Sequence, residues 1–226
     1  MRLHKLDEGL WSLEQPLRFP GGFTLPVRGV AVGLPGGGTA LLSPPPRLGE
    51  VRAELEALGP VRALAAPNLL HHLGLPAAQA LYPQARVFRR PGLDAKRPDV
   101  RFTDLLAEAP PALWAEVLGQ VEVHGMPRVQ EVAFVHRPSR TLLLTDLCFN
   151  VRSAPNLFTR VFMRLNGAYG RFGVSRVGRG YMEDCKAVRA SVDRLLALDF
   201  ERIVMAHGEV VASGGRAALE RAFAFL

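Results

Sequence analysis

Two pairs of apolar segments constrain the fold of this chain more than any other feature. In each pair a short turn separates the two segments. The first pair lies within Val27–Ser43 and turns at the Pro-Gly-Gly-Gly sequence of residues 35–38. The second pair consists of Glu131–Val135 and Thr141–Thr145, which flank the polar segment 136–140. Two apolar runs around a turn of this kind are typical of a β-hairpin. We therefore expect two hairpins that lie far apart in the sequence.

Helices and further strands are predicted between and after the hairpins. Apolar residues recur at helical spacing over Leu48–Leu58, Leu157–Leu165, Ala187–Leu198 and Arg216–Leu226. Short apolar runs predict strands at Val61–Ala66, Ala85–Phe88, Val121–Val123 and Arg202–Met205. Together with the hairpins, this order is typical of an α/β protein with mixed sheets. The two glycine-rich loops that bind nucleotide phosphates are not present, so nucleotide binding by those loops is not supported.

The net charge of the chain is +7, from 28 Lys and Arg against 21 Asp and Glu. Nearly all of the basic residues are arginine, which is as typical of a GC-rich genome as of a nucleic-acid-binding surface. Cys148 and Cys185 are the only cysteines and lack a short metal-binding spacing. The N-terminal residues are charged, and no apolar run is long enough to span a bilayer. We therefore expect a globular, cytoplasmic protein.

Polar residues that can bind metal follow three of the predicted strands. His71 and His72 lie beyond the strand Val61–Ala66, Asp146 follows the second hairpin, and His207 follows the last strand. If these strands lie side by side, their following loops converge at one edge, where sites are commonly built. Imidazole and carboxylate groups together bind zinc, iron or manganese. Taken singly, each residue could equally be a hydrogen-bonded structural residue at the end of a strand.

The order of these features resembles the metallo-β-lactamase superfamily. The segments that carry the resemblance are Pro67-Asn68-Leu69-Leu70-His71-His72, Ser139-Arg140-Thr141-Leu142, Thr145-Asp146-Leu147 and Ala206-His207-Gly208. They are similar to an uncharacterised branch of that superfamily. The resemblance implies an αββα sandwich of two mixed β-sheets flanked by helices. It also implies a single domain over residues 1–226, with a basic helical insert at about residues 151–180.

The superfamily carries a His-x-His-x-Asp-His loop, and its alignment with this chain implies a reduced metal site. Pro67 and Leu69 fall on the first two histidines and have no donor atom, so the site for the first metal is expected to be lost. His71 falls on the aspartate and His72 on the last histidine. The implied ligands of the one remaining metal are therefore His71, His72, Asp146 and His207.

The remaining histidines are weaker candidates. His124 is a secondary candidate ligand, because it lies in the region of the superfamily's middle-loop histidine but at a longer spacing from the following hairpin. His136 is expected to be solvated in a hairpin turn, and His4 to be peripheral.

Two functions from different classes follow from this ligand set. The first is a metal-dependent hydrolase with one zinc or another divalent transition metal and an unknown substrate. Four protein ligands would close a tetrahedral zinc site, so catalysis would require Asp146 to step back and act as a base or orient water. The alternative is a degenerate, non-catalytic member of the family that binds a small anionic ligand or an anionic surface.

The basic insert raises a third possibility. Residues 151–180 carry six arginines with aromatic residues between them, a composition that can bind nucleic acid or an anionic membrane. We favour instead a helix whose apolar face packs on the domain while its arginines lie in solvent or roof the cleft. A small, anionic molecule is therefore the expected partner, and nucleic acid and membrane are not favoured. The sequence does not indicate an oligomeric state.

Overall fold

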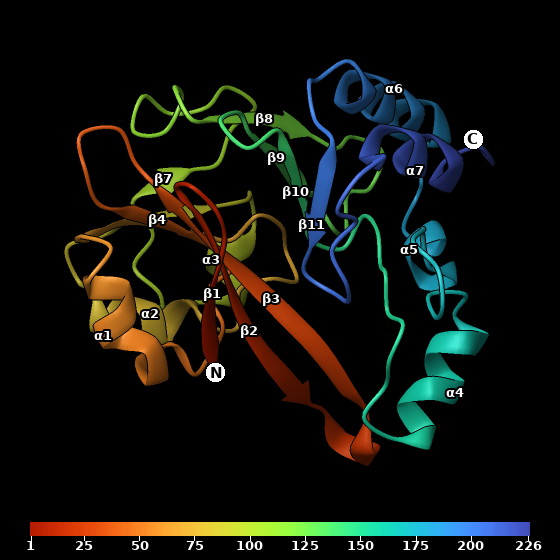
Figure 1. Ribbon diagram of the computed structural model, residues 1–226, viewed down its shortest axis with the longest axis horizontal. Helices are drawn as coiled ribbons and strands as arrows, with labels where there is room; N and C mark the ends of the chain where they lie inside the picture. Colours follow the sequence, from red (N-terminus) through yellow and green to blue (C-terminus); the bar gives the residue numbers. More distant parts are fainter.

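The structure is a computed structural model that describes residues 1–226, and its strands form two mixed sheets (Figure 1). The first sheet has the strand order β1-β2-β3-β4-β5-β6-β7. Its strands are β1 (Arg2–Asp7), β2 (Leu10–Arg18), β3 (Thr24–Gly33), β4 (Thr39–Leu42), β5 (Val61–Ala65), β6 (Arg86–Arg89) and β7 (Asp104–Leu105). Strands β1 to β4 are antiparallel, and β4 to β7 are parallel.

The second sheet has four strands in the order β11-β10-β9-β8. They are β8 (Leu118–Glu122), β9 (Val132–His136), β10 (Thr141–Leu144) and β11 (Arg202–Met205). Strands β8 to β10 are antiparallel, whereas β11 is parallel to β10. The two hairpins predicted from the sequence are therefore β3–β4 in the first sheet and β9–β10 in the second.

The helices lie on the outer faces of the sheets and at one end of the molecule. The first sheet is covered by α1 (Arg52–Glu56), α2 (Leu75–Leu81) and α3 (Leu93–Lys96), with a 3₁₀ turn at Leu48–Val51 before α1. The second sheet is covered by α6 (Cys185–Leu196) and α7 (Gly215–Ala222). Between these groups, α4 (Leu157–Leu165) and α5 (Arg176–Gly180) lie beyond the sheets, with a 3₁₀ turn at Pro20–Gly22 in the β2–β3 loop (Figure 1). No helix has the length and apolar character needed to cross a membrane.

Alternation of side chains along the strands explains the layered architecture. In β10, Leu143 faces the core between the two sheets, whereas Leu142 and Leu144 face the helices α6 and α7. In β4, Leu41 faces the helices on the other side of the molecule. Successive side chains of a strand point to opposite faces, so each sheet is apolar on both sides and needs a cover on each. The predicted αββα sandwich is thus confirmed.

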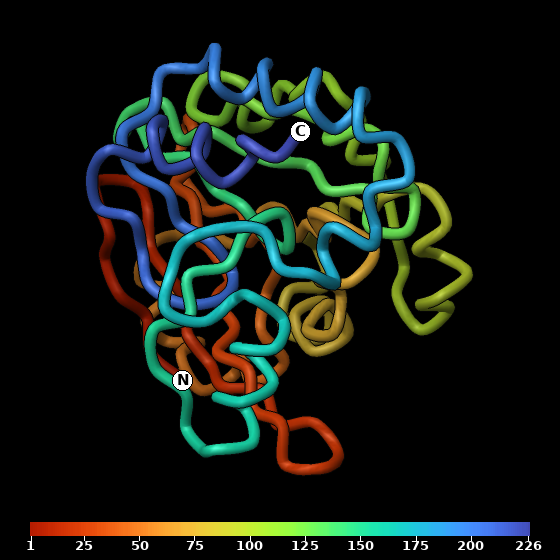
Figure 2. Tube along the Cα trace, turned by 90° about the vertical axis from the view of Figure 1, so that its right-hand side faces the viewer, coloured from red at the N-terminus to blue at the C-terminus, as the bar shows by residue number.

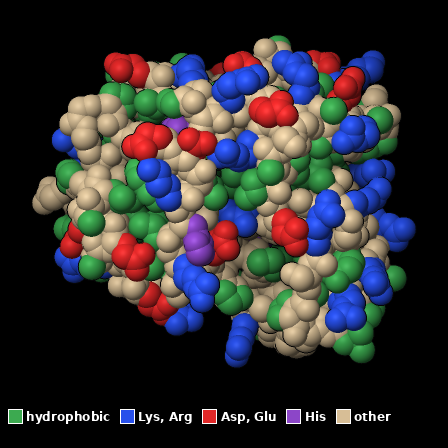
Figure 3. Space-filling view, in the orientation of Figure 1, with side chains coloured by type: hydrophobic (Ala, Val, Ile, Leu, Met, Phe, Trp, Pro, Cys, Tyr) green, Lys and Arg blue, Asp and Glu red, His purple; other side chains and the backbone are tan.

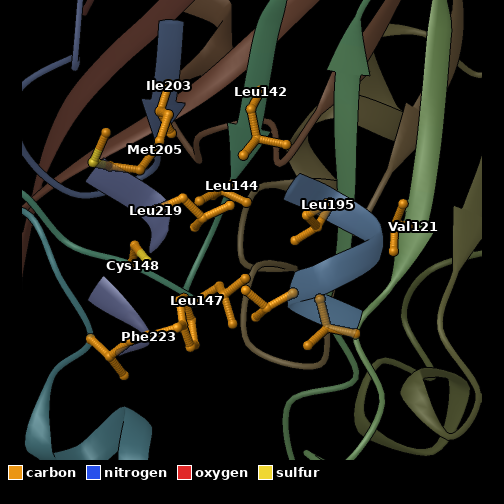
Figure 4. Packing of buried hydrophobic residues seen from close by; sticks show 14 of the residues in the cluster. Val121, Leu142, Leu144, Leu147, Cys148, Leu195, Ile203, Met205, Leu219 and Phe223 are labelled. Carbon is orange, nitrogen blue, oxygen red and sulfur yellow. The ribbon is translucent and has the colours of Figure 1, made fainter. Parts of the chain in front are cut away.

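A cluster of buried apolar side chains lies between the second sheet and its helices (Figure 4). The cluster includes Leu144 of β10, Met205 of β11, Leu219 of α7 and Leu195 of α6, together with Phe223, which directly follows α7. This core fixes the ends of β10 and β11 side by side. The residues that follow each strand consequently emerge at the same edge.

The N-terminal hairpin is the main part of the fold that the sequence analysis did not predict. Strand β1 is largely exposed and polar, so it lacks the apolar run that marks a strand. Strand β2 contains Pro16, which is normally excluded from central strands. Pro16 lies beyond the end of the β1 pairing, where β2 has β3 as its only neighbour.

Helix α4 has the predicted bounds, but its orientation is the reverse of the expected one. Its buried residues are Thr159 and Met163, whereas the apolar residues of its amphipathic face are exposed. The expectation that this face packs on the domain is therefore wrong. The helix is instead held by the tip of the β2–β3 hairpin, where the backbone N–H of Thr24 donates to Thr159 Oγ1 at 3.0 Å. Figure 2 looks onto this side of the molecule, with the cyan segment that contains α4 toward the viewer.

Candidate metal centre

Three of the four predicted ligands lie together at one edge of the two sheets. His71 follows β5, Asp146 follows β10 and His207 follows β11, and one donor atom from each lies within 4.8 Å of the others. Asp146 Oδ2 is 3.3 Å from His71 Nε2, and Asp146 Oδ1 is 3.3 Å from His207 Nε2. The two Nε2 atoms are 3.1 Å apart. All three side chains are largely withdrawn from solvent.

Asp146 is held in place by a buried asparagine. Asn68 Nδ2 donates to Asp146 Oδ2 at 2.7 Å and to Thr145 Oγ1 at 2.9 Å. Asn68 Oδ1 in turn accepts the backbone N–H groups of Leu70 and His71, at 2.9 and 2.7 Å. One side chain therefore ties the carboxylate to the loop that carries the first imidazole.

A second carboxylate, that of Glu131, holds the backbone around Asp146. It is fully buried, and it accepts the backbone N–H groups of Thr145, Asp146 and Leu147 at 2.7 to 2.9 Å. Burial, together with the nearby charge of Asp146, raises the pKa of Glu131, although the backbone N–H groups act in the opposite direction. All three donors point at its oxygens, which favours the ionised form at neutral pH. Glu131 therefore fixes the backbone at the end of β10.

The tautomer of His207 follows from its hydrogen bond. His207 Nδ1 lies 2.9 Å from the carbonyl oxygen of Pro26, which can only accept, so Nδ1 carries the proton. Nε2 then presents its lone pair to Asp146 and His71. The ring also stacks on Phe149 at 5.0 Å between centroids. Gly208 follows at φ 102°, and a Cβ there would lie 2.2 Å from the carbonyl oxygen of Asn150.

His71 is positioned by the loop after β4. Its Nδ1 lies 2.6 Å from Ser43 Oγ, and Ser43 has a left-handed φ of 51°. The two loops approach so closely that a Cβ on Gly74 would lie 1.9 Å from the carbonyl oxygen of Pro44. Burial lowers the pKa of His71, but the charge and hydrogen bond of Asp146 outweigh it, and the net shift is upward. Burial also opposes ionisation of Asp146, yet the two imidazoles lower its pKa overall.

The donor set fits a divalent transition metal. Two imidazole nitrogens and a carboxylate oxygen around one point repel one another unless a proton or a metal ion lies between them. Ligands about 2.0–2.1 Å from a tetrahedral zinc ion are about 3.3 Å from one another. The 3.1 Å between the two Nε2 atoms is close to this spacing. Each imidazole also lies 3.3 Å from one oxygen of Asp146, His71 from Oδ2 and His207 from Oδ1. A zinc ion held by these three residues alone would keep a position open for water, as in catalytic zinc sites.

His72 lies outside this group. Its Nδ1 is buried without a hydrogen-bond partner. Burial, followed by the charges of Arg97 and Lys96, lowers its pKa. The structure therefore brings three of the four expected ligands together and leaves His72 outside the cluster.

The other histidines and the substituted loop positions are also apart from the centre. His124 is exposed, and it contributes its backbone N–H to Ser191 Oγ at 3.0 Å. His136 is 1% exposed, with Nδ1 2.7 Å from Ser139 Oγ, so the expectation that it is solvated is wrong. It is the buried last residue of β9 and does not lie in the turn. His4 is exposed on β1, and Pro67 and Leu69 are buried without donor atoms.

Two mostly apolar hollows open onto the centre from either side. The first, of about 220 Å³, reaches Ser43, His71, Asp146 and His207. The second, of about 190 Å³, reaches Asp146 between Phe149 and α4. Neither is lined by an arginine or a lysine. The insert therefore contributes apolar side chains to the second hollow. Its arginines line neither hollow, so the alternative that they roof the cleft is not supported.

Three supporting residues were not identified from the sequence. Glu131 was assigned to an apolar run, although a carboxylate within such a run is itself a signal of a buried role. Asn68 entered only as part of the motif, and Ser43 only as the end of a hairpin. Nothing in the sequence shows that Ser43 meets His71, because their contact depends on the close approach at Gly74.

The sequence matches no family model and no curated protein. Solved structures do resemble the chain. A metallo-β-lactamase from Hirschia baltica matches with a TM-score of 0.69 and 15% identity, over 99% of this chain and 96% of its own. One from Erythrobacter litoralis matches with a TM-score of 0.69 and 16% identity, over 99% and 96%. The metallo-β-lactamase FIM-1 from Pseudomonas aeruginosa in its mono-zinc form matches with a TM-score of 0.65 and 12% identity, over 99% and 95%. With two mixed sheets, helices on both outer faces and this near-complete overlap, the chain has the metallo-β-lactamase fold.

Proposed function

We propose that this protein is a metal-dependent hydrolase that works with one divalent metal ion, held by His71, Asp146 and His207. The observation that carries the proposal is the convergence of their three donor atoms within 4.8 Å. Zinc suits two imidazoles and one carboxylate. A single ion is supported by Pro67 and Leu69, which offer no ligand where the superfamily has histidines. FIM-1, a solved protein of similar fold, has a mono-zinc form.

The residues around the centre have separate roles in binding the metal and in orienting its ligands. A bound zinc ion would supply Lewis acidity and lower the pKa of water in its open position. Asn68 donates to the carboxylate of Asp146, and Glu131 accepts the backbone N–H of the same residue, so the side chain keeps one orientation. The Pro26 carbonyl holds His207 in the tautomer whose Nε2 faces the centre. Such partners orient ligands and tune a metal site.

The two hollows define the substrate in outline. The first has a volume of about 220 Å³ and the second of about 190 Å³. Both are lined mainly by apolar side chains and meet the polar centre at Asp146. We propose a small molecule whose apolar part occupies a hollow while its hydrolysable bond lies at the centre. No basic side chain lines either hollow, so the expected negative charge of the substrate is not supported by their lining.

Metal analysis of the purified protein tests the proposal most directly. We expect close to one transition-metal ion per chain, or tight binding of added zinc by the metal-free protein in calorimetry. His71→Ala and His207→Ala should each abolish binding, whereas the matched control His124→Ala should leave it unchanged, because His124 is exposed and is not one of the three clustered donors. Absence of bound metal together with no affinity for zinc would refute the proposal.

A non-catalytic role is the second candidate. It is favoured by the close polar contacts of 3.1 to 3.3 Å that His71, Asp146 and His207 already form among themselves. Zinc-loaded protein that hydrolyses none of a panel of lactams, lactones, esters and phosphodiesters, yet binds apolar ligands in the hollows, would support this role. We further propose a cytoplasmic location, which the two free cysteines support.

A further inference from the structure

Helix α4 exposes a complete apolar face. Leu157, Phe158, Val161, Phe162 and Leu165 are between 43% and 69% exposed. At 100° per residue these five side chains form one continuous arc of the helix surface. The buried Thr159 and Met163 lie beside that arc, so the helix contacts the domain through its narrow polar and sulfur-containing side.

The exposed face is firmly held. Asn156 caps the helix, with Oδ1 accepting the Thr159 N–H at 2.8 Å, and its Nδ2 donates to the carbonyl of Gly22 at 2.9 Å. Phe162 packs edge-on against Phe23 of the hairpin tip at 4.8 Å between centroids. The helix therefore presents its apolar face in a fixed orientation.

The apolar surface extends beyond the helix. Phe19 on the hairpin tip and Val177 on α5 are also exposed. Leu70 and Leu73, on the rim of the first hollow, continue it toward the metal centre. Most of the large apolar side chains that the protein exposes belong to this region, which we call the apolar face; Leu105 and Phe225 are the exceptions.

The two chain segments that carry most of the apolar face hold charges of one sign only. Residues 147–182 contain six arginines and no acidic residue, and residues 15–49 likewise contain no acidic residue. Arg160 and Arg164 on α4 and Arg18 on the hairpin are exposed. Within residues 147–182 only Arg152 forms an ion pair, with Glu209 at 3.8 Å. In Figure 3 the surface at the lower right, where Figure 1 shows α4, carries blue and green groups and no red.

We propose that the apolar face docks on a lipid bilayer that contains anionic lipids. An amphipathic helix with an exposed apolar side, aromatic residues and flanking arginines is suited to the interface between headgroups and acyl chains. The arginines are complementary to anionic headgroups. A second copy of the chain fits less well, because self-association through this face would bring the same unpaired arginines together.

Docking has a consequence for the metal centre. Phe162 and Val177 line the second hollow, and Phe19, Leu70 and Leu73 line the first. Both hollows therefore reach from the docked face to Asp146, so an apolar substrate dissolved in the bilayer could enter without crossing water. This consequence rests on the proposed hydrolase function, whereas docking itself does not.

Co-sedimentation with vesicles tests the docking and needs neither metal nor activity. We expect the protein to bind vesicles of phosphatidylcholine mixed with phosphatidylglycerol at low salt, and to bind phosphatidylcholine alone weakly. The triple variant Leu157→Ser, Phe158→Ser, Leu165→Ser should bind at least about tenfold more weakly, since it removes three large apolar side chains from the contact. Arg18→Gln with Arg160→Gln should weaken binding on the order of tenfold and flatten its salt dependence.

Matched controls lie away from the apolar face. Leu105→Ser removes a leucine of similar exposure on β7, and Arg62→Gln removes an exposed arginine on β5; both should bind as the wild type does. No binding to the anionic vesicles at low salt, or full binding by the triple variant, would overturn the proposal. A wild-type dimer in light scattering that the triple variant dissociates would also overturn it, and would assign the face to a contact between copies of the chain.

Discussion

Replacing Glu131 with glutamine tests the support of the metal centre. The carboxylate is fully buried; Oε1 accepts the Thr145 N–H, and Oε2 accepts the N–H groups of Asp146 and Leu147. A glutamine has one acceptor oxygen, so whichever way its amide is turned, its NH₂ group faces at least one of these donors. The best orientation keeps two hydrogen bonds and leaves the N–H of Thr145 without a partner.

The expected cost of Glu131→Gln follows from that lost bond. An unsatisfied buried donor costs about 1–3 kcal/mol, and the two remaining bonds lose their charge assistance. We therefore expect the free energy of unfolding to fall by about 2–3 kcal/mol. For a chain of this length that corresponds to a melting temperature lower by roughly 5–10 °C. The backbone of Asp146 should shift as well, so zinc affinity should fall by about 10–100-fold.

Urea unfolding of the metal-free proteins, with zinc titration of each, measures both effects. Glu54→Gln is the matched control, because it removes a carboxylate that is exposed and unpaired on α1. A change below about 0.5 kcal/mol for Glu131→Gln, the range of neutral surface substitutions, would refute the reasoning. It would mean that the raised pKa of Glu131 leaves the group protonated in the folded protein, where glutamine is a close mimic.

Three further predictions concern single residues. Asp146→Asn removes the only anionic donor of the centre, so zinc affinity in calorimetry should fall by about 100-fold or more while His124→Ala leaves it unchanged. Gly208→Ala should lower the free energy of unfolding by about 3 kcal/mol in urea, because its Cβ would lie 2.2 Å from the carbonyl oxygen of Asn150 at a left-handed φ; wild-type stability would contradict this. Burial lowers the pKa of His136 in the folded protein. Between about pH 6.5 and that lower pKa only the unfolded chain binds the proton, so the free energy of unfolding should decrease as the pH is lowered, by at most about 1.4 kcal/mol per pH unit. His136→Gln should lose this component of the pH dependence, and identical pH profiles for both proteins would count against the burial of a neutral imidazole.

Much of the sandwich could be predicted because its signals are local. The hairpins β3–β4 and β9–β10 and the strand β11 are apolar runs bounded by turns, and the structure places each where the sequence does. The hypothesis that His71, Asp146 and His207 meet rested on their positions after strands. That hypothesis required only that the preceding strands end at the same edge of the sandwich, and they do.

The rest depended on contacts between distant segments. Which of the neighbouring histidines at positions 71 and 72 faces the centre is decided by the Ser43 loop, packed against Gly74. The exposed face of α4 could not be predicted for the same kind of reason. An amphipathic pattern shows that a helix has an apolar side, but it does not show what covers that side.

The three proposed ligands come from segments that only the folded chain brings together, since β5 belongs to one sheet and β10 and β11 to the other. An ion held there would bind the folded protein and not the unfolded chain. By mass action it would then add stability that grows with the logarithm of free metal, about 2.7 kcal/mol at a hundred times the dissociation constant. The supply of metal in the cell would in that case regulate how long the protein survives as well as whether it acts. Thermal unfolding at graded zinc concentrations would report the affinity without any substrate.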